Sequence, residues 1–142
     1  MRLWHFTSVR HLPLIEAAGF LKVSETNLHP VVEHHGPDAV WFLDGPDLGD
    51  ARHGLNAAPP GWVVPDKTEV RIEVEVPDGW VRAWLPWAEA QGIDRGWLHA
   101  LTSEDGGRAA AERWRVVFRP VRRDRWVEVC VRQSDGAWEA KG

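Results

Sequence analysis

The sequence contains no tyrosine and only one cysteine, Cys130. A single cysteine excludes an intrachain disulfide and any zinc site built from several cysteines. Lysine is scarce as well, because 14 of the 17 basic residues are arginine. No apolar run approaches the ~18 residues that cross a bilayer. Charged residues also interrupt the N-terminal stretch where a signal peptide would need a continuous apolar core. We therefore expect a soluble protein, most simply a cytoplasmic one, with no membrane partner.

The residues that are present have the composition of a folded domain. Apolar residues make up 44% of the 142 residues and charged residues 27%, which excludes a collagen-like or wholly disordered chain. The length suits one domain over residues 1–142. Ten tryptophans are too many for the centre of so small a core. Several of them should therefore lie half-buried, as on the wall of a ligand cleft.

Charge is distributed unevenly along the chain. The net charge is −4, but residues 108–132 hold eight arginines against three acidic residues, a local balance of +5. Residues 1–107 carry eight basic and sixteen acidic side chains, a balance of −8. The basic segment could meet the phosphates of a nucleotide or a nucleic acid. Alternatively, it is a solvated strand face that pairs with the acidic part of the same domain.

Hydrophobic periodicity predicts an α+β fold. The clearest element is a strand in which Val70, Ile72, Val74 and Val76 alternate with polar residues, so one face enters the core. Further strands are predicted over residues 3–7, 39–43, 113–119 and 126–132. Helices are predicted from Ser8 to Gly19 and over residues 81–91 and 94–102, and a turn over residues 104–107. Because strands outnumber helices and cluster late, we expect a mostly antiparallel, twisted sheet.

Metal binding is not favoured by the sequence. His29, His34, His35 and His53 lie in loops and match no familiar ligand spacing. Glu69, Glu73 and Glu75, with Asp66 and Lys67 before them, supply the residue types of a metal-dependent nuclease. A solvated strand face explains the three glutamates more simply. Cys130 sits among valines in a predicted strand, which is typical of an inert buried thiol.

The first predicted strand has a distinctive pattern. In Trp4-His5-Phe6-Thr7, the histidine and the threonine are two residues apart and therefore share one face of the strand, with the aromatic residues on the other. A histidine beside a hydroxyl can hydrogen-bond a ribose while aromatic rings stack on a flat base. A structural histidine is the alternative interpretation.

The N-terminal part of the sequence resembles a known family. The stretch LWHFTSVRHLPLIEAAGFL is similar to the opening of DarT-like ADP-ribosyltransferases, in which an aromatic–His–aromatic–Thr strand leads into a Leu-Pro-containing helix. Later elements follow in the same order: an Asn-bearing loop at residues 24–28, the aromatic strand at residues 40–42, and a late strand opened by Glu112. The resemblance implies an ADP-ribosyltransferase-like fold, with flanking helices around a cleft for the cofactor NAD.

The resemblance also implies roles for individual residues. His5 would hold the adenosine-side ribose of NAD, with Thr7 in support, and Trp41 and Phe42 would lie near the nicotinamide. Glu112 would be the catalytic carboxylate that stabilises positive charge on the nicotinamide ribose as nicotinamide leaves. Glu128 is the rival for that role, on a strand face expected to be shared with Trp126 and Cys130. The remaining cofactor-binding candidates are Phe6, Asn27 and Arg52, the last being the nearest match to an arginine of the family.

Three functional hypotheses follow from the sequence. The first is an NAD-dependent ADP-ribosyltransferase that modifies a nucleic acid or another macromolecule, in a toxin or phage–host setting. The fold expected from the resemblance also hosts RNA 2′-phosphotransferases and inactive binding relatives. The second is a non-enzymatic nucleic-acid-binding or inhibitor module that uses the Arg-rich residues 108–132. The third is a metal-dependent nuclease.

Overall fold

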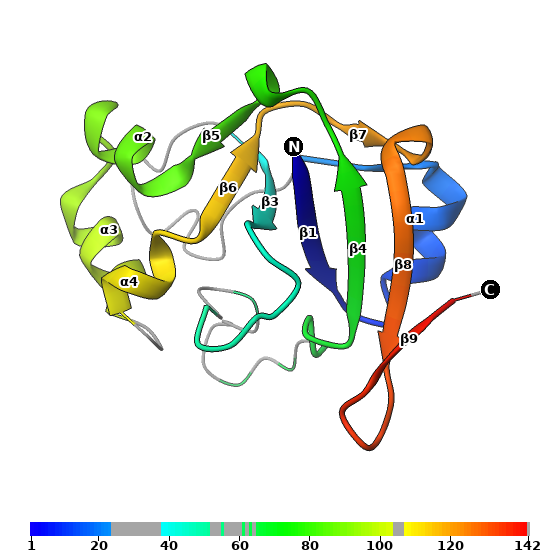
Figure 1. The fold of residues 1–142 in the computed structure, drawn as a ribbon. Coiled ribbons are helices and arrows are strands. Elements are labelled where there is room, and N and C mark those ends of the chain that lie inside the picture. Colours follow the sequence, from blue (N-terminus) through cyan, green and yellow to red (C-terminus); the bar gives the residue numbers. More distant parts are fainter. Residues whose placement is uncertain are drawn as a thin grey trace.

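The computed structural model describes residues 1–23, 38–51, 55, 61, 63, 65–103 and 107–141. It is a mixed α+β structure, as predicted (Figure 1). In chain order the elements are β1 (Arg2–Thr7), α1 (Leu12–Ala18), β2 (Phe20–Leu21), β3 (Val40–Leu43), β4 (Val70–Glu75), η1 (Asp78–Trp80), β5 (Val81–Ala83), α2 (Trp84–Ala90), α3 (Arg95–Thr102), α4 (Gly107–Ala111), β6 (Trp114–Val117), β7 (Val121–Arg122), η2 (Arg123–Arg125), β8 (Trp126–Arg132) and β9 (Trp138–Ala140).

A seven-stranded sheet with the order β5-β6-β3-β1-β4-β8-β9 organises the structure. Each of its neighbouring strand pairs is antiparallel, which confirms the expected sheet type. The N-terminal strand β1 lies in the middle, between β3 and β4 (Figure 1). β2 and β7 pair separately as a two-stranded antiparallel sheet. The first residues of the chain therefore lie at the centre of the sheet.

One face of the sheet packs against α1 and the β2–β7 pair. The predicted alternation in β4 is confirmed, because Val70, Ile72 and Val74 are fully buried while the residues between them are partly exposed. They join a core that also holds Leu12 of α1 and Val121 of β7. Burying such side chains is worth about 1.5–3 kcal/mol each before entropy is counted. We call this side of the sheet the α1 face.

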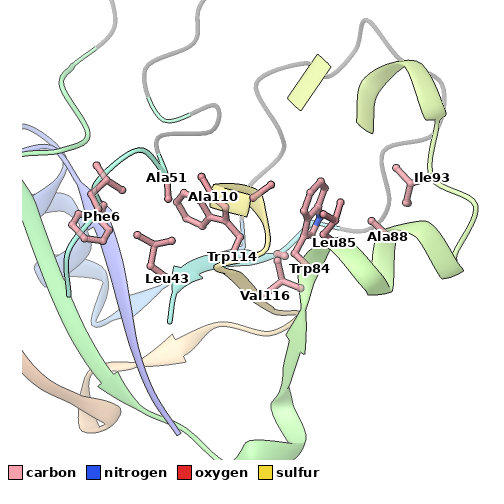
Figure 2. Packing of buried hydrophobic residues seen from close by; sticks show 13 residues of the cluster. Phe6, Leu43, Ala51, Trp84, Leu85, Ala88, Ile93, Ala110, Trp114 and Val116 are labelled. Atoms are coloured by element: carbon pink, nitrogen blue, oxygen red, sulfur yellow. The ribbon is translucent and has the colours of Figure 1, made fainter. Parts of the chain in front are cut away.

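The opposite side of the sheet carries a second core, which we call the α2 face. It is built from α2, α4, β6 and the chain that follows β3. Figure 2 shows Trp84 and Leu85 of α2 and Ala110 of α4 gathered near Trp114 of β6. The helices α2, α3 and α4 lie beside the β3–β6–β5 half of the sheet and away from β8 and β9 (Figure 1).

Two expectations about local structure are wrong. Residues 81–91 do not form one helix, because Val81–Ala83 is the edge strand β5, paired with β6, and α2 begins only at Trp84. Pro86 lies in the first turn of α2, where its missing N–H costs no hydrogen bond. Gly107, expected to end a turn, instead begins the short helix α4, whereas residues 104–106 of the expected turn lie outside the described residues.

The strand β8 matches its predicted bounds but not its predicted faces. Glu128 pairs with Glu73, whereas Trp126 pairs with Val74, so Val127 is an extra residue on β8 and forms a β-bulge. Trp126 consequently packs on the α1 face, while Glu128 shares the other face with Glu73. The expectation that Trp126, Glu128 and Cys130 line one face is therefore wrong, since the bulge shifts the alternation by one residue.

Candidate functional site

The candidate site is centred on His5. Its side chain lies on the α1 face of β1, alternating with Trp4 and Phe6, and its ring meets Phe42 edge-on with centroids 5.8 Å apart. His5 Nδ1 lies 2.8 Å from the main-chain oxygen of Trp41. Because a carbonyl oxygen can only accept, Nδ1 must carry the hydrogen. The Trp41 carbonyl therefore fixes both the orientation and the tautomer of this imidazole.

The surroundings of His5 also keep it neutral. Burial lowers the pKa of His5 below its usual 6.5, the bond to Trp41 opposes this, and the positive charge of Lys67 lowers the pKa further. At neutral pH the ring is therefore uncharged, and Nε2 presents a lone pair. No hydrogen-bond partner for Nε2 is found among the described residues. His5 thus offers one oriented acceptor to a hydroxyl group.

A second histidine and a lysine lie close to this position. Ser8 Oγ accepts the His11 backbone N–H at 3.1 Å, and its hydroxyl lies 2.8 Å from His11 Nδ1. Burial lowers the pKa of His11, and the positive charges of Lys67, Arg10 and Lys22 lower it further. Burial lowers the pKa of Lys67 too. Positive charge from Lys67 thus reaches both imidazoles at the end where β1 leaves the sheet.

The described groups of this arrangement are suited to binding a ligand. It offers the neutral acceptor of His5, the buried hydroxyl groups of Thr7 and Ser8, and the positive charge of Lys67. Such groups suit a ligand that carries both hydroxyl groups and negative charge, as a nucleotide does. The neighbouring Asp66 is engaged by Thr68 Oγ1 at 2.6 Å and by Arg132 at 3.3 Å.

The structure brings together only part of the candidate set. His5, Thr7, Phe42 and the carbonyl of Trp41 meet on the α1 face. The side chains of Phe6 and Trp41 point the other way. The Phe6 ring lies 6.1 Å from that of Trp138. The Trp41 ring contacts two tryptophans of the α2 face, Trp84 at 5.2 Å and Trp114 at 6.1 Å. Asn27 and Arg52 lie outside the described residues.

The two catalytic candidates do not face His5. Glu112 follows α4, which packs on the α2 face, and its exposed carboxylate pairs with Arg108 at 3.4 Å. Glu128 lies opposite Glu73, on the face that His5 does not share. Its carboxylate accepts a hydrogen bond from the Cys130 thiol at 3.2 Å. The described structure therefore places neither carboxylate across from the imidazole.

The alternative metal site is not assembled in the described part of the chain. No cluster of three or more histidine, cysteine, aspartate or glutamate residues there could hold a metal ion. Glu73 and Glu75 instead pair with Arg2 at 2.7 and 2.8 Å. The four loop histidines, His29, His34, His35 and His53, lie outside the described residues.

Sequence reasoning did not connect Lys67 with His5. The signal was present, because Lys67 directly precedes β4 and Thr7 ends its antiparallel partner β1. Antiparallel pairing of these strands alone brings Lys67 next to residues 8–11. Hydrophobic periodicity predicts both strands but does not indicate that they pair.

Comparisons with known protein families, curated proteins and solved structures find no match to this chain. Among the described residues, no helix is both long enough and apolar enough to span a membrane. Function is therefore inferred from the site itself and from the resemblance of the chain's first strand and helix to ADP-ribosyltransferases.

Proposed function

We propose that this protein binds a nucleotide of the NAD type, with His5 accepting a hydrogen bond from a ribose hydroxyl. The observation that carries the proposal is the fixed, neutral state of His5. Its Nδ1–H is held 2.8 Å from the Trp41 oxygen, and burial lowers its pKa. A neutral imidazole with one nitrogen engaged offers the other as an acceptor. This is the role that the resemblance to ADP-ribosyltransferases implies for His5.

The charge near the site supports an anionic ligand. Lys67 is close enough to lower the pKa values of both His5 and His11, and burial leaves its ammonium only partly solvated. The attraction between an ammonium and a phosphate is stronger in a poorly solvated site than in bulk water. The ribose-binding half of an NAD site thus fits the residues present.

The catalytic half fits less well. Transfer of ADP-ribose needs a carboxylate near the nicotinamide ribose, and Glu112 and Glu128 both lie away from the face of His5. The proposal is accordingly one of binding, and no transfer step is derived from these residues. NAD-dependent transfer to a nucleic acid or another macromolecule is the extension that the resemblance suggests.

The binding proposal is tested by titrating NAD into the protein in a calorimeter. The wild type should bind, and His5→Asn should bind about tenfold more weakly, because it can still donate to Trp41 but lacks an acceptor in place of Nε2. His5→Gln, whose amide oxygen can take the place of Nε2, should retain more affinity than His5→Asn. The exposed His99 supplies the control variant His99→Asn. No binding by the wild type at millimolar NAD, or equal affinities for all four proteins, would contradict the proposal.

A second measurement decides whether binding extends to transfer. Nicotinamide release from NAD is followed with and without a nucleic acid present, for the wild type and for Glu112→Gln and Glu128→Gln. Release that disappears in one variant alone would assign the catalytic carboxylate to that residue. NAD binding without nicotinamide release would restrict the function to binding.

A further inference from the structure

The arginines of residues 108–132 fall into two groups that the sequence does not distinguish. Arg108, Arg113, Arg115 and Arg132 each lie within 4.0 Å of an acidic side chain of the same chain, as the ion pairs to Glu89, Asp44 and Asp66 show. Their charges are used within the fold. Arg119, Arg122, Arg123 and Arg125 lie near β7 and η2 and are all exposed; among the described residues, only Arg123 of these four has an acidic side chain within 4.0 Å, that of Glu16 at 3.8 Å.

Three arginines of the second group, Arg119, Arg123 and Arg125, contact tryptophan rings. The guanidinium carbons of Arg119 and Arg125 lie 4.3 and 5.0 Å from the ring centre of Trp80. That of Arg123 lies 5.7 Å from the ring of Trp126. These contacts bring together η1, β7 and η2, which lie along the top of the molecule in Figure 1. We call these two tryptophans and four arginines the Arg–Trp surface.

Asp124, also in η2, and Glu16 of α1 offset only part of the charge of the four arginines. Within the described part of the chain, Arg119, Arg122 and Arg125 form no ion pair. Arg123 reaches Glu16 at 3.8 Å, and Glu16 is shared with Lys141. Two guanidinium groups held near one indole repel each other, and the contact with the ring offsets only about 0.5–1 kcal/mol for each at an exposed site. A bound polyanion would remove this repulsion.

The tryptophans restrict the positions of the arginines that contact them. The Trp126 indole N–H donates to the Val121 oxygen at 3.3 Å, which fixes the ring, and Trp80 packs against the core of the α1 face. A guanidinium that lies on a ring keeps its N–H groups directed outward, where they can contact phosphate oxygens in pairs. Trp80 and Trp126 are both half-buried, so part of each residue remains accessible beside the guanidinium groups.

From this geometry we infer that the Arg–Trp surface binds single-stranded nucleic acid through its phosphate backbone. Arginines beside partly exposed aromatic rings, as at Trp80 and Trp126, are a combination that binds single strands without sequence preference. An acidic protein would use the charges but gain nothing from the rings. The inference is independent of the proposed nucleotide site, because Lys67 precedes β4 and Trp80 follows it, so the two sites lie at opposite ends of that strand.

The test is the binding of a labelled 20-nucleotide single strand, followed by fluorescence anisotropy at several salt concentrations. For four phosphate contacts, affinity should fall about 50-fold between 50 and 200 mM salt, since the slope is about −0.7 per contact. The double variant Arg119→Gln/Arg125→Gln should bind more weakly and lose only about sevenfold over the same range. The matched control, Arg108→Gln/Arg132→Gln, removes the same charge from the ion-paired group and should behave like the wild type.

Three outcomes would overturn the inference. They are no binding of the oligonucleotide at 50 mM salt, equal losses in both double variants, or tighter binding of polyglutamate or of anionic lipid vesicles than of the oligonucleotide. Circular dichroism of each variant checks that the fold is intact. Because neither Arg119 nor Arg125 contacts His5, Lys67 or Asp66, NAD binding should be unchanged in the Arg119→Gln/Arg125→Gln variant, so a failure here is distinct from a failure of the proposed function.

Discussion

Arg113 and Arg119 lie six residues apart in the chain and serve different purposes. Arg113 donates to the carboxylate of Asp44 at 3.1 Å and to the main-chain oxygens of Asp47 and Leu48 at 2.6 and 3.2 Å. It therefore fastens the chain after β3 to the start of β6. Arg119 lies over Trp80, and no ion pair engages it among the described residues.

The difference shows that a run of arginines has no single meaning. Where the fold brings acidic groups and carbonyl oxygens nearby, the guanidinium becomes a structural connector. Where it brings an indole, the charge stays exposed and available to a partner. The interpretation of residues 108–132 as a self-paired face thus describes part of the segment, and the phosphate-binding surface that we propose concerns the remaining arginines.

The largest effect that separates the two groups is on stability. Arg113→Ala removes three hydrogen bonds and should lower the free energy of unfolding by about 2 kcal/mol, because the loop after β3 loses its attachment. Arg119→Ala should cost less than ~1 kcal/mol, the value of an exposed cation–π contact. Urea unfolding of both variants measures the difference. Equal losses of stability would remove the distinction between the groups.

Acidification should protonate His5 and thereby lower the stability of the fold, whereas the arginines keep their charge. The pKa of His5 is lowered in the folded state, so below about pH 6.5 the unfolded chain binds more protons and stability falls with decreasing pH. The slope for one histidine is at most about 1.4 kcal/mol per pH unit. Unfolding free energies at pH 7.5 and 5.5 should therefore differ more for the wild type than for His5→Asn.

The same pH change gives a control at the Arg–Trp surface. Arginine stays protonated throughout this range, so oligonucleotide affinity at fixed salt should be the same at pH 7.5 and 5.5. A pH dependence of this binding that His5→Asn abolishes would mean that the two sites are coupled and would contradict their separation.

A smaller effect is expected from Trp80. In Trp80→Phe the smaller ring attracts a guanidinium less strongly, so Arg119 and Arg125 should be less well ordered. We expect about a threefold loss of oligonucleotide affinity in anisotropy titrations, with a loss of stability below ~1 kcal/mol. Trp87→Phe, on α2 and in contact with Phe118 rather than with an arginine, is the matched control for fluorescence and volume. Equal effects of both substitutions would show that the indole of Trp80 has no specific role.

Much of the fold could be predicted from periodicity, but the pairing of strands could not. The alternation of residues 69–76 and the bounds of β8 follow from local pattern alone. β2, β5, β7 and β9 are two or three residues long, too short to carry a period, and they exist because a partner strand lies beside them. The bulge at Val127 likewise depends on the register with β4.

The same limit applies to the candidate site. A period of two is enough to place His5 and Thr7 on one face of β1. The face on which Glu112 or Glu128 lies depends on the order of strands in the sheet, on which side α4 packs, and on the bulge in β8. Residues that belong to one element could therefore be grouped correctly, whereas groups drawn from distant elements could not.

The smallest expected effect tests whether acidic partners decide the role of an arginine. Glu16→Gln removes the acidic side chain that forms an ion pair with Arg123 within the described residues. The pair is exposed and 3.8 Å long, so stability should change by less than ~0.5 kcal/mol. Arg123 would then resemble Arg119, and oligonucleotide affinity at 50 mM salt should rise about twofold, with a steeper salt dependence. Glu89→Gln, which releases Arg108 at a distance from the Arg–Trp surface, should leave the affinity unchanged. If both substitutions raise the affinity equally, net charge alone governs binding, and the position of the arginines does not.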